Sequence, residues 1–340
     1  MSQNPIITKL QEPMPQYISG LIPVIVILGT SPFKLLFDKL IWVFKCLGCP
    51  FTGLFYYLVI GADPVEMCIY WLPEEFFLTT NENNLDFPPV GLHAKNMLIT
   101  LEQDKIMKQC TANAPVMDRL SSLASAYYII VGIISGIYSA TGPCTPEDWP
   151  SLTLSFLWTF PVIVKRTIRT EIVVKDPGID FNELKELNRH LIRVLEENED
   201  IEATENEFDE RGERLIPKKF DKSCKKFMFI ITTLFSVVFP WVSVVMAFFT
   251  PPIGFFCRSK FLAGLCTLWT FNSLLECIYH INFGYGFLKG KKTNIHVYFV
   301  LSGIAVTGLL ILLIVLINDS RLWVKLFGDE CTTNSCISGD

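Results

Sequence analysis

The 23-residue stretch Phe227–Phe249, FMFIITTLFSVVFPWVSVVMAFF, contains no charged side chain. The hydrocarbon core of a bilayer is about 30 Å thick, so a helix needs roughly 20 apolar residues to cross it. Two later stretches, residues 261–283 and 295–317, have the same length and are also predominantly apolar. Together these three stretches predict three consecutive transmembrane helices.

The composition of the whole chain agrees with a membrane protein. Of the 340 residues, 50% are hydrophobic and 19% are charged, and the mean hydropathy is +0.38. Average soluble domains carry about 25% charged residues. The sequence therefore predicts an integral membrane protein, in contact with the lipid bilayer.

Further apolar stretches extend the membrane part toward the N-terminus. Residues 40–60 are long enough to span, although Lys45 lies near the start of this stretch and Pro50 in its middle. Residues 120–140 also qualify. The predicted fold class is an all-α polytopic helix bundle with about seven transmembrane helices. The remaining two segments, each a short span or a re-entrant piece, are residues 17–36 and 149–164.

The distribution of Lys and Arg predicts the orientation. Basic residues gather at both ends of residues 165–226, whereas residues 141–150 contain none. Because cytoplasmic loops are enriched in Lys and Arg, the N-terminus is predicted to be cytoplasmic and the C-terminus outside. The predicted parts are an N-terminal membrane hairpin (1–62), a cytoplasmic or interfacial amphipathic segment (63–119), a second membrane hairpin (120–164), a charged cytoplasmic loop (165–226), three transmembrane helices (227–317) and an outer tail (318–340).

The charged cytoplasmic loop contains two different segments. Leucines recur at helical spacing over residues 180–195 and predict an amphipathic helix, and the acidic run 196–210 predicts a solvated tether. The helix either lies against the membrane side of the protein or docks a cytoplasmic protein partner. Five lysines at the end of the loop are predicted to contact anionic lipid headgroups. They are Lys218, Lys219, Lys222, Lys225 and Lys226.

Four of the eleven cysteines fall on the outer side of this topology, namely Cys144, Cys257, Cys331 and Cys336. Disulfides persist in oxidising compartments, so at least one is predicted among the four. Two pairings remain open, since Cys331 can close on Cys336 within the tail, or Cys144 can join Cys257.

Cys46 and Cys49 have the spacing of a metal-binding or redox pair. A zinc site needs further ligands, and the sequence offers neither a second cysteine pair nor a histidine partner for these two. No metal site is predicted here.

Small residues recur every four positions in the predicted span 120–140, at Gly132, Gly136 and Ala140. Such a stripe lets another helix backbone approach closely. The stripe predicts helix packing, either within the chain or between two copies of it.

The run TPPIGFFCRS, residues 250–259, follows directly after a hydrophobic stretch. It resembles a T-P-P-[I/V]-G-x-x-C-R-S pattern of an uncharacterised fungal family of multi-pass membrane proteins. The resemblance covers about ten residues, and it implies a multi-pass architecture without implying an activity. The two prolines also have a structural role independent of this resemblance, because they are expected to end the preceding helix.

A polar stripe interrupts the apolar stretch 261–283. Asn272, Glu276 and His280 are spaced i, i+4 and i+8, so they project from nearly one face of a helix. An acidic side chain in mid-bilayer costs on the order of 3 kcal/mol, so this face should point into the bundle. Either Glu276 titrates in a proton-coupled path, or it pairs with His280 or another basic residue and fixes the helix register.

The sequence contains no catalytic motif of the phosphate-loop, metalloprotease or serine-hydrolase type, and no cofactor or nucleic-acid partner is predicted. It favours a non-enzymatic scaffold or receptor-like membrane protein, whose cytoplasmic loop recruits a partner. The alternative is a transporter or channel built around the polar stripe. Transporters often carry internal repeats, and their absence from the sequence favours the scaffold.

Overall fold

The computed structural model of the chain describes about half of its residues, and all structural statements below concern these. They comprise residues 35–62, 64–71, 78–79, 97–100, 111–113, 116–141, 154–168, 172–174, 215–217, 222–250, 253–255, 257–283 and 293–316.

Three long helices form the C-terminal half of the bundle: α12 (Lys222–Phe249), α13 (Cys257–Phe283) and α14 (Thr293–Leu316). Each contains a segment long and apolar enough to cross a membrane. At 1.5 Å per residue, a 23-residue segment is about 35 Å long, which exceeds the hydrocarbon thickness. The three predicted C-terminal stretches are therefore helical within the described residues, and each helix contains a segment long and apolar enough to cross a membrane.

Residues 40–60 do not form the straight helix that the sequence predicts. They belong to two helices, α3 (Leu36–Gly48) and α4 (Pro50–Leu58), whose axes meet at 106°. Proline lacks an N–H group and forces the preceding residue out of the helical region, and Cys49 accordingly is extended, with φ −139° and ψ 94°. The pair is either one broken span or a re-entrant loop. Among the described residues, three helices are therefore long and apolar enough to cross a membrane, or four if the bent pair is one span.

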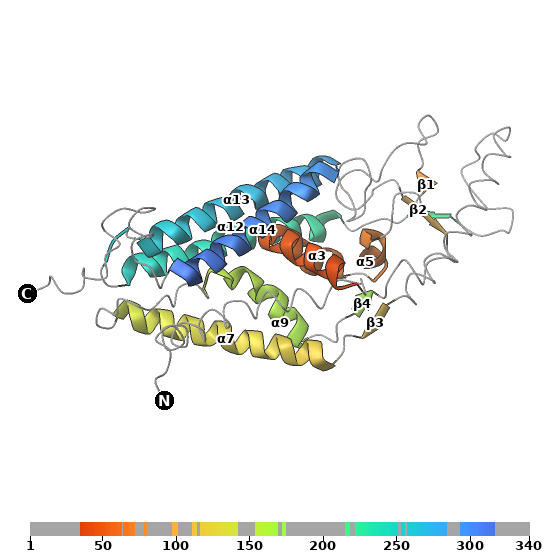
Figure 1. Cartoon of the computed structure of the whole chain (residues 1–340). Coiled ribbons are helices and arrows are strands. Elements are labelled where there is room, and N and C mark those ends of the chain that lie inside the picture. The colour runs from red at the N-terminus through yellow and green to blue at the C-terminus, as the bar shows by residue number, and fades with distance from the viewer. Residues whose placement is uncertain are drawn as a thin grey trace, which may run out of the picture.

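The remaining helices lie between α4 and α12 in the chain. A short 3₁₀ turn, η1 (Ile60–Ala62), and α5 (Pro64–Trp71) follow α4. The 26-residue α7 (Val116–Thr141) covers the predicted span 120–140 and lies beside α9 (Phe160–Ile168), as Figure 1 shows. It also contacts α12. That α7 crosses the membrane stays a prediction.

The predicted segments 17–36 and 149–164 compare differently with the structure. Nearly all of residues 17–36 lie outside the described part of the chain. The described part of 149–164 contains a 3₁₀ turn, η3 (Leu157–Thr159), which leads directly into α9. This segment is therefore an interrupted helix.

Five short strands, which the all-α prediction does not include, form two small antiparallel sheets near one end of the bundle (Figure 1). One sheet joins β1 (Leu78–Thr79), β2 (Met97–Thr100) and β5 (Leu215–Pro217), and the other joins β3 (Thr111–Asn113) to β4 (Ile172–Val174). Each sheet thus pairs the predicted amphipathic segment 63–119 with the predicted charged loop 165–226. This pairing requires both regions to lie on the same side of the membrane.

Helices α3 and α14 cross at close range, and glycine makes this approach possible. A Cβ atom on Gly48 would clash with the backbone carbonyl of Phe299, and one on Gly303 would clash with the carbonyl of Phe44. The two backbones therefore pack directly against each other, as small residues permit in membrane helices. The predicted small-residue stripe lies elsewhere, in α7.

Candidate functional site

The polar stripe of α13 is buried inside the protein. Asn272 and Glu276 have no exposed surface, and His280 is 3% exposed. On the opposite face of the same helix, Phe271 and Ile278 are more than half exposed, as expected for side chains that face lipid. The stripe therefore points toward α3, α4 and α14.

Asn272 holds the end of α3 and joins it to α14. Its side-chain amide donates hydrogen bonds to the Gly48 carbonyl at 2.7 Å and to the Ser302 hydroxyl at 2.8 Å. Its carbonyl oxygen accepts a hydrogen bond of 2.9 Å from the Tyr298 hydroxyl. Because the last carbonyls of a helix have no partner within the helix, the side chain supplies one that the bilayer cannot.

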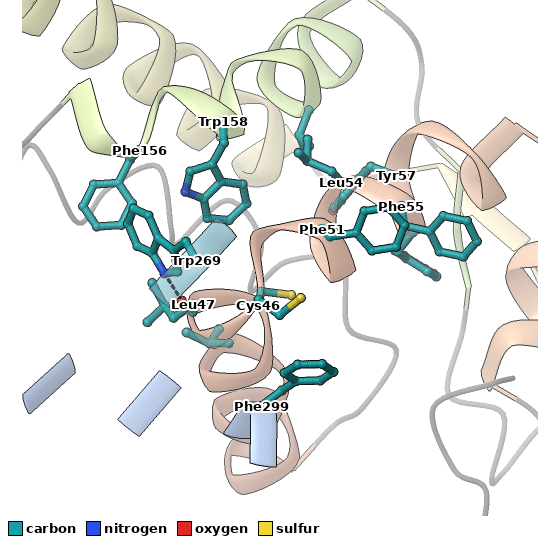
Figure 2. Close-up of a cluster of buried hydrophobic side chains, with 14 of the residues drawn as sticks. Cys46, Leu47, Phe51, Leu54, Phe55, Tyr57, Phe156, Trp158, Trp269 and Phe299 are labelled. Atoms are coloured by element: carbon teal, nitrogen blue, oxygen red, sulfur yellow. Dashed lines mark hydrogen bonds between the residues drawn. The ribbon is translucent and has the colours of Figure 1, made fainter. Parts of the chain in front are cut away.

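Trp269 lies one turn before Asn272 on α13 and binds the neighbouring carbonyl of α3. Its indole N–H donates a 2.6 Å hydrogen bond to the Leu47 carbonyl, drawn as a dashed line in Figure 2. Figure 2 also shows Phe156 and Trp158 beside the indole, and the ring centroids of Phe156 and Trp269 lie 5.6 Å apart. Two side chains of α13 thus cap the two carbonyls at the end of α3.

Glu276 lies beside the first turn of α4, just after the break. Its Oε1 atom is 3.5 Å from the Thr52 hydroxyl, which donates to it, and 3.9 Å from Nε2 of His280. The N-terminus of a helix carries a partial positive charge, so this position favours a carboxylate. The His280 ring is packed on Phe55, with centroids 4.2 Å apart.

Lys45 contributes the opposite charge from α3. This lysine is fully buried, one turn before the end of the helix, and its ammonium group interacts electrostatically with Glu276. His296, near the start of α14, interacts electrostatically with both Lys45 and His280. We name Lys45, Glu276, His280 and His296 the charge cluster.

Tyr70 brings α5 against the charge cluster. Burial first, and then the charge of Glu276, raise the pKa of the Tyr70 hydroxyl well above its ordinary value, so the group keeps its proton. Tyr70 belongs to an aromatic group with Trp42, Tyr56 and Trp71, whose rings meet mainly edge to face.

This arrangement can hold or release a proton without a cofactor. Glu276 is the acid, and the Thr52 hydroxyl, His280 and the first turn of α4 lie beside its carboxylate. Cys46 and Cys49 lie at the break as buried free thiols. In the described part of the chain, no group of three or more His, Cys, Asp or Glu side chains is placed to hold a metal ion.

The other predicted sites lie partly within the described residues. Gly132, Gly136 and Ala140 belong to α7. The predicted lysines 222, 225 and 226 belong to the first two turns of α12, and Cys257 begins α13. Outside the described residues lie Lys218, Lys219, Cys144, Cys331 and Cys336, the predicted amphipathic helix 180–195 and the acidic tether 196–210, so the headgroup contacts and the disulfide stay predictions.

Several residues of the site are not predicted from the sequence. Lys45 is the main one, although a lysine within an apolar run and five residues before a proline was a visible signal. Ser302 and Tyr298 give no such signal, because serine and tyrosine are ordinary in membrane helices. His296 lies at the edge of its apolar stretch, where a polar residue is expected in any case.

The class of protein follows from its apolar helices. Three helices are suited to crossing a membrane, which is compatible with an integral membrane location. The broken α3–α4 pair and the buried charge cluster lie among these helices. Comparisons of the chain with protein families, with curated proteins and with solved structures return no match.

Proposed function

We propose that this protein is a multi-pass membrane transporter that couples the movement of its substrate to proton binding at Glu276. One observation carries the proposal: a fully buried acid lies at the junction of a broken helix, beside Thr52 and His280. Ionisable groups within membranes are costly and mark ion or proton pathways. Discontinuous helices form the binding sites of many transporters.

The position of Glu276 also supplies a mechanical link between protonation and helix movement. As a carboxylate it is attracted to Lys45 on α3 and to the first turn of α4. A bound proton removes that charge and weakens both attractions at once. In this mechanism α13 is held against the break when Glu276 is charged and released when it is neutral.

A second candidate function, a non-enzymatic scaffold, is favoured by two other observations. Every polar atom of Asn272 is engaged within the protein, as in a fixed structural joint. The two small sheets tie residues 63–119 to residues 165–226. In the proposed topology both regions are cytoplasmic, and together they form the unit that recruits a protein partner. In this alternative the charge cluster only fixes the helix break.

Proton flux into reconstituted liposomes separates the two functions. The purified protein is reconstituted with a pH-sensitive dye inside, and an inward pH gradient is applied. Transport predicts flux above protein-free liposomes that Glu276→Gln abolishes, whereas Asp38→Asn, a matched change in α3 outside the cluster, leaves it unchanged. Flux equal to that of protein-free liposomes would refute transport and leave the scaffold.

The proposed topology, with the N-terminus cytoplasmic and the C-terminus outside, has a direct test. Protease added to the cytoplasmic side of sealed vesicles should cut within residues 196–214, which include the acidic tether, because this run has few apolar residues. Cleavage from the opposite side only would invert the orientation. Alkylation of Cys144, Cys257, Cys331 and Cys336 without a reductant would rule out the outer disulfide.

A further inference from the structure

We propose that the bundle consists of two rigid bodies that turn against each other at the helix break, and that the hydrogen bonds of Asn272 are the joint that opens between them. One body is α3 with α14, which we name the α3–α14 body. The other contains α4, α9, α12 and α13, and we name it the α12–α13 body. The inference rests on the proposed transport function, which requires a moving part, and it identifies that part.

The α3–α14 body is held together by direct backbone contact. Gly48 lies against the Phe299 carbonyl, and one turn away Gly303 lies against the Phe44 carbonyl, with no room for a Cβ atom at either glycine. Two such contacts, one helical turn apart on each helix, fix both the distance between the helices and their register. Closely packed elements shift as units rather than deform continuously. Helices α3 and α14 should therefore move together.

Helix α4 belongs to the other body, although it follows α3 directly in the chain. Phe51 and Phe55 of α4 meet the Phe229 ring of α12 edge to face, with centroids 5.4 and 5.8 Å apart. Toward the other end of α4, Lys165 of α9 donates a hydrogen bond to the Tyr57 carbonyl, one of the last carbonyls of the helix. Among the described helix pairs, only α3 with α14 has a more extensive contact than α12 with α13. These contacts tie α4, α9, α12 and α13 to one another.

The connection between the two bodies has the properties of a hinge. Within the described residues it is the single residue Cys49, and the other connection in the chain, residues 284–292, lies outside them. The backbone of Cys49 is extended, with φ −139° and ψ 94°, between helices whose axes meet at 106°. Pro50 has no N–H group with which to continue the hydrogen-bond ladder of α3. Hinges absorb a domain rotation in the dihedral angles of a few residues at the ends of elements, and Cys49 is such a residue.

Side chains of α13 make the hydrogen bonds that cross the boundary between the bodies. The Asn272 side chain makes three of those described, and all its partners belong to the α3–α14 body: Gly48, Ser302 and Tyr298. Trp269 adds one hydrogen bond to the end of α3. A rotation at Cys49 therefore has to open the contacts of Asn272, and it leaves the backbone contacts inside the α3–α14 body in place.

Aromatic rings form a second contact across the boundary. Trp42 of α3 meets Tyr56 of α4 edge to face, with ring centroids 5.6 Å apart. Contacts between apolar surfaces are not directional, so these rings can slide past each other, as packed elements do in shear movements. Asn272, whose hydrogen bonds are directional, is therefore the contact that holds the boundary closed.

The test measures distances between two spin labels in the full-length protein, reconstituted in liposomes. The labels are attached to encoded non-natural residues, so the native cysteines stay in place. Three pairs of exposed positions are labelled in separate samples. Phe37 with Val297 reports on the α3–α14 body, Ile230 with Phe271 on the α12–α13 body, and Ile230 with Ile311 on the boundary between them.

Removal of the joint should move the boundary distance alone. In Asn272→Leu we expect the boundary distance, or a second population of it, to differ from that of the parent by more than about 2 Å, the scale of a hinge rearrangement. Both distances within the bodies should stay unchanged. Trp241→Phe is the matched control, because it removes a hydrogen bond inside the α12–α13 body and should leave all three distances unchanged.

Two outcomes would overturn the inference. The first is an unchanged boundary distance in folded Asn272→Leu, which would make the break a fixed joint. The second is a distance within either body that changes as much as the boundary distance, which would mean that the bundle deforms as a whole. If Asn272→Leu does not fold, the double variant Tyr298→Phe, Ser302→Ala decides by the same criteria, because it removes the contacts of Asn272 with α14 and keeps its contact with Gly48.

Proton flux, measured on the parent protein in the same liposomes, separates this inference from the transport function. A boundary distance that shifts when the joint is removed, without flux in the parent, supports the hinge and refutes transport. Flux in the parent with a boundary distance that stays fixed supports transport and overturns the hinge.

Discussion

The α12–α13 pair and the α3–α4 region satisfy their backbone hydrogen bonds in different ways. Helices α12 and α13 are continuous, so each satisfies its own backbone, apart from the one hydrogen bond that Pro240 cannot donate within α12. The polar contacts described between the two helices are single hydrogen bonds. Trp241 donates a 3.0 Å hydrogen bond to Thr270, and Thr233 lies 3.5 Å from the sulfur of Cys277. A continuous helix needs only a complementary surface and a few polar contacts from its neighbour.

The α3–α4 region has a break in the membrane and needs more from its neighbours. Pro50 ends the hydrogen-bond ladder, and the carbonyls of Leu47 and Gly48 lose their helical partners. Trp269 and Asn272 on α13 supply replacements at 2.6 and 2.7 Å. The polar face of α13 therefore supplies the hydrogen-bond donors that the break between α3 and α4 requires.

The largest expected effect comes from removing the acid at the break. Glu276→Leu leaves the buried Lys45 ammonium uncompensated, which should lower the free energy of unfolding by about 3–5 kcal/mol. Thermal unfolding in detergent measures the change. The double variant Glu276→Leu, Lys45→Met should recover most of the loss, and a double variant less stable than Glu276→Leu would contradict the pairing.

The second largest effect comes from removing the cap of α3. Asn272→Leu takes a partner from the Gly48 carbonyl and from two hydroxyls, with an expected loss of about 3 kcal/mol in the free energy of unfolding. Phe271→Leu, on the lipid-facing side of the same helix, should stay within about 0.5 kcal/mol of the parent. Equal losses in the two variants would show that the cap contributes nothing.

A smaller loss is expected at the crossing of α3 and α14. Gly303→Ala places a methyl group against the Phe44 carbonyl, and such overpacking costs about 1–3 kcal/mol. Gly308→Ala is a matched control in the same helix, because a Cβ atom there meets nothing within 4 Å. The control should be neutral or stabilising by up to about 1 kcal/mol, since alanine favours a helix more than glycine does. Equal stability of the two variants would contradict the close crossing.

The contrast between the two regions also explains what could be predicted from the sequence. The spans of α12, α13 and α14 were predictable because about 20 apolar residues leave few alternatives. Pro50 made a bend in residues 40–60 foreseeable, but its angle depends on packing against α13 and α14. The partnership of Lys45 with Glu276 joins residues far apart in the chain, and no local pattern encodes it.

The five strands escaped prediction for a different reason. They are two to four residues long, too short to display the alternation of apolar and polar residues that indicates a strand. Their pairing depends on where the membrane helices place the chain segments that enter and leave the bundle. Local sequence determines neither their length nor their partner.

The smallest expected effect lies between α12 and α13. Trp241→Phe keeps an aromatic ring but removes the hydrogen bond to Thr270, and polar contacts between membrane helices contribute about 0.6 kcal/mol on average. Thermal unfolding in detergent should therefore show a loss below about 1 kcal/mol. Trp269→Phe is the matched change at the break, where the Leu47 carbonyl loses its indole partner, and it should cost about 1–3 kcal/mol. If Trp241→Phe costs as much as Trp269→Phe, continuous and broken helices make equal demands on their neighbours, and the distinction between the two regions fails.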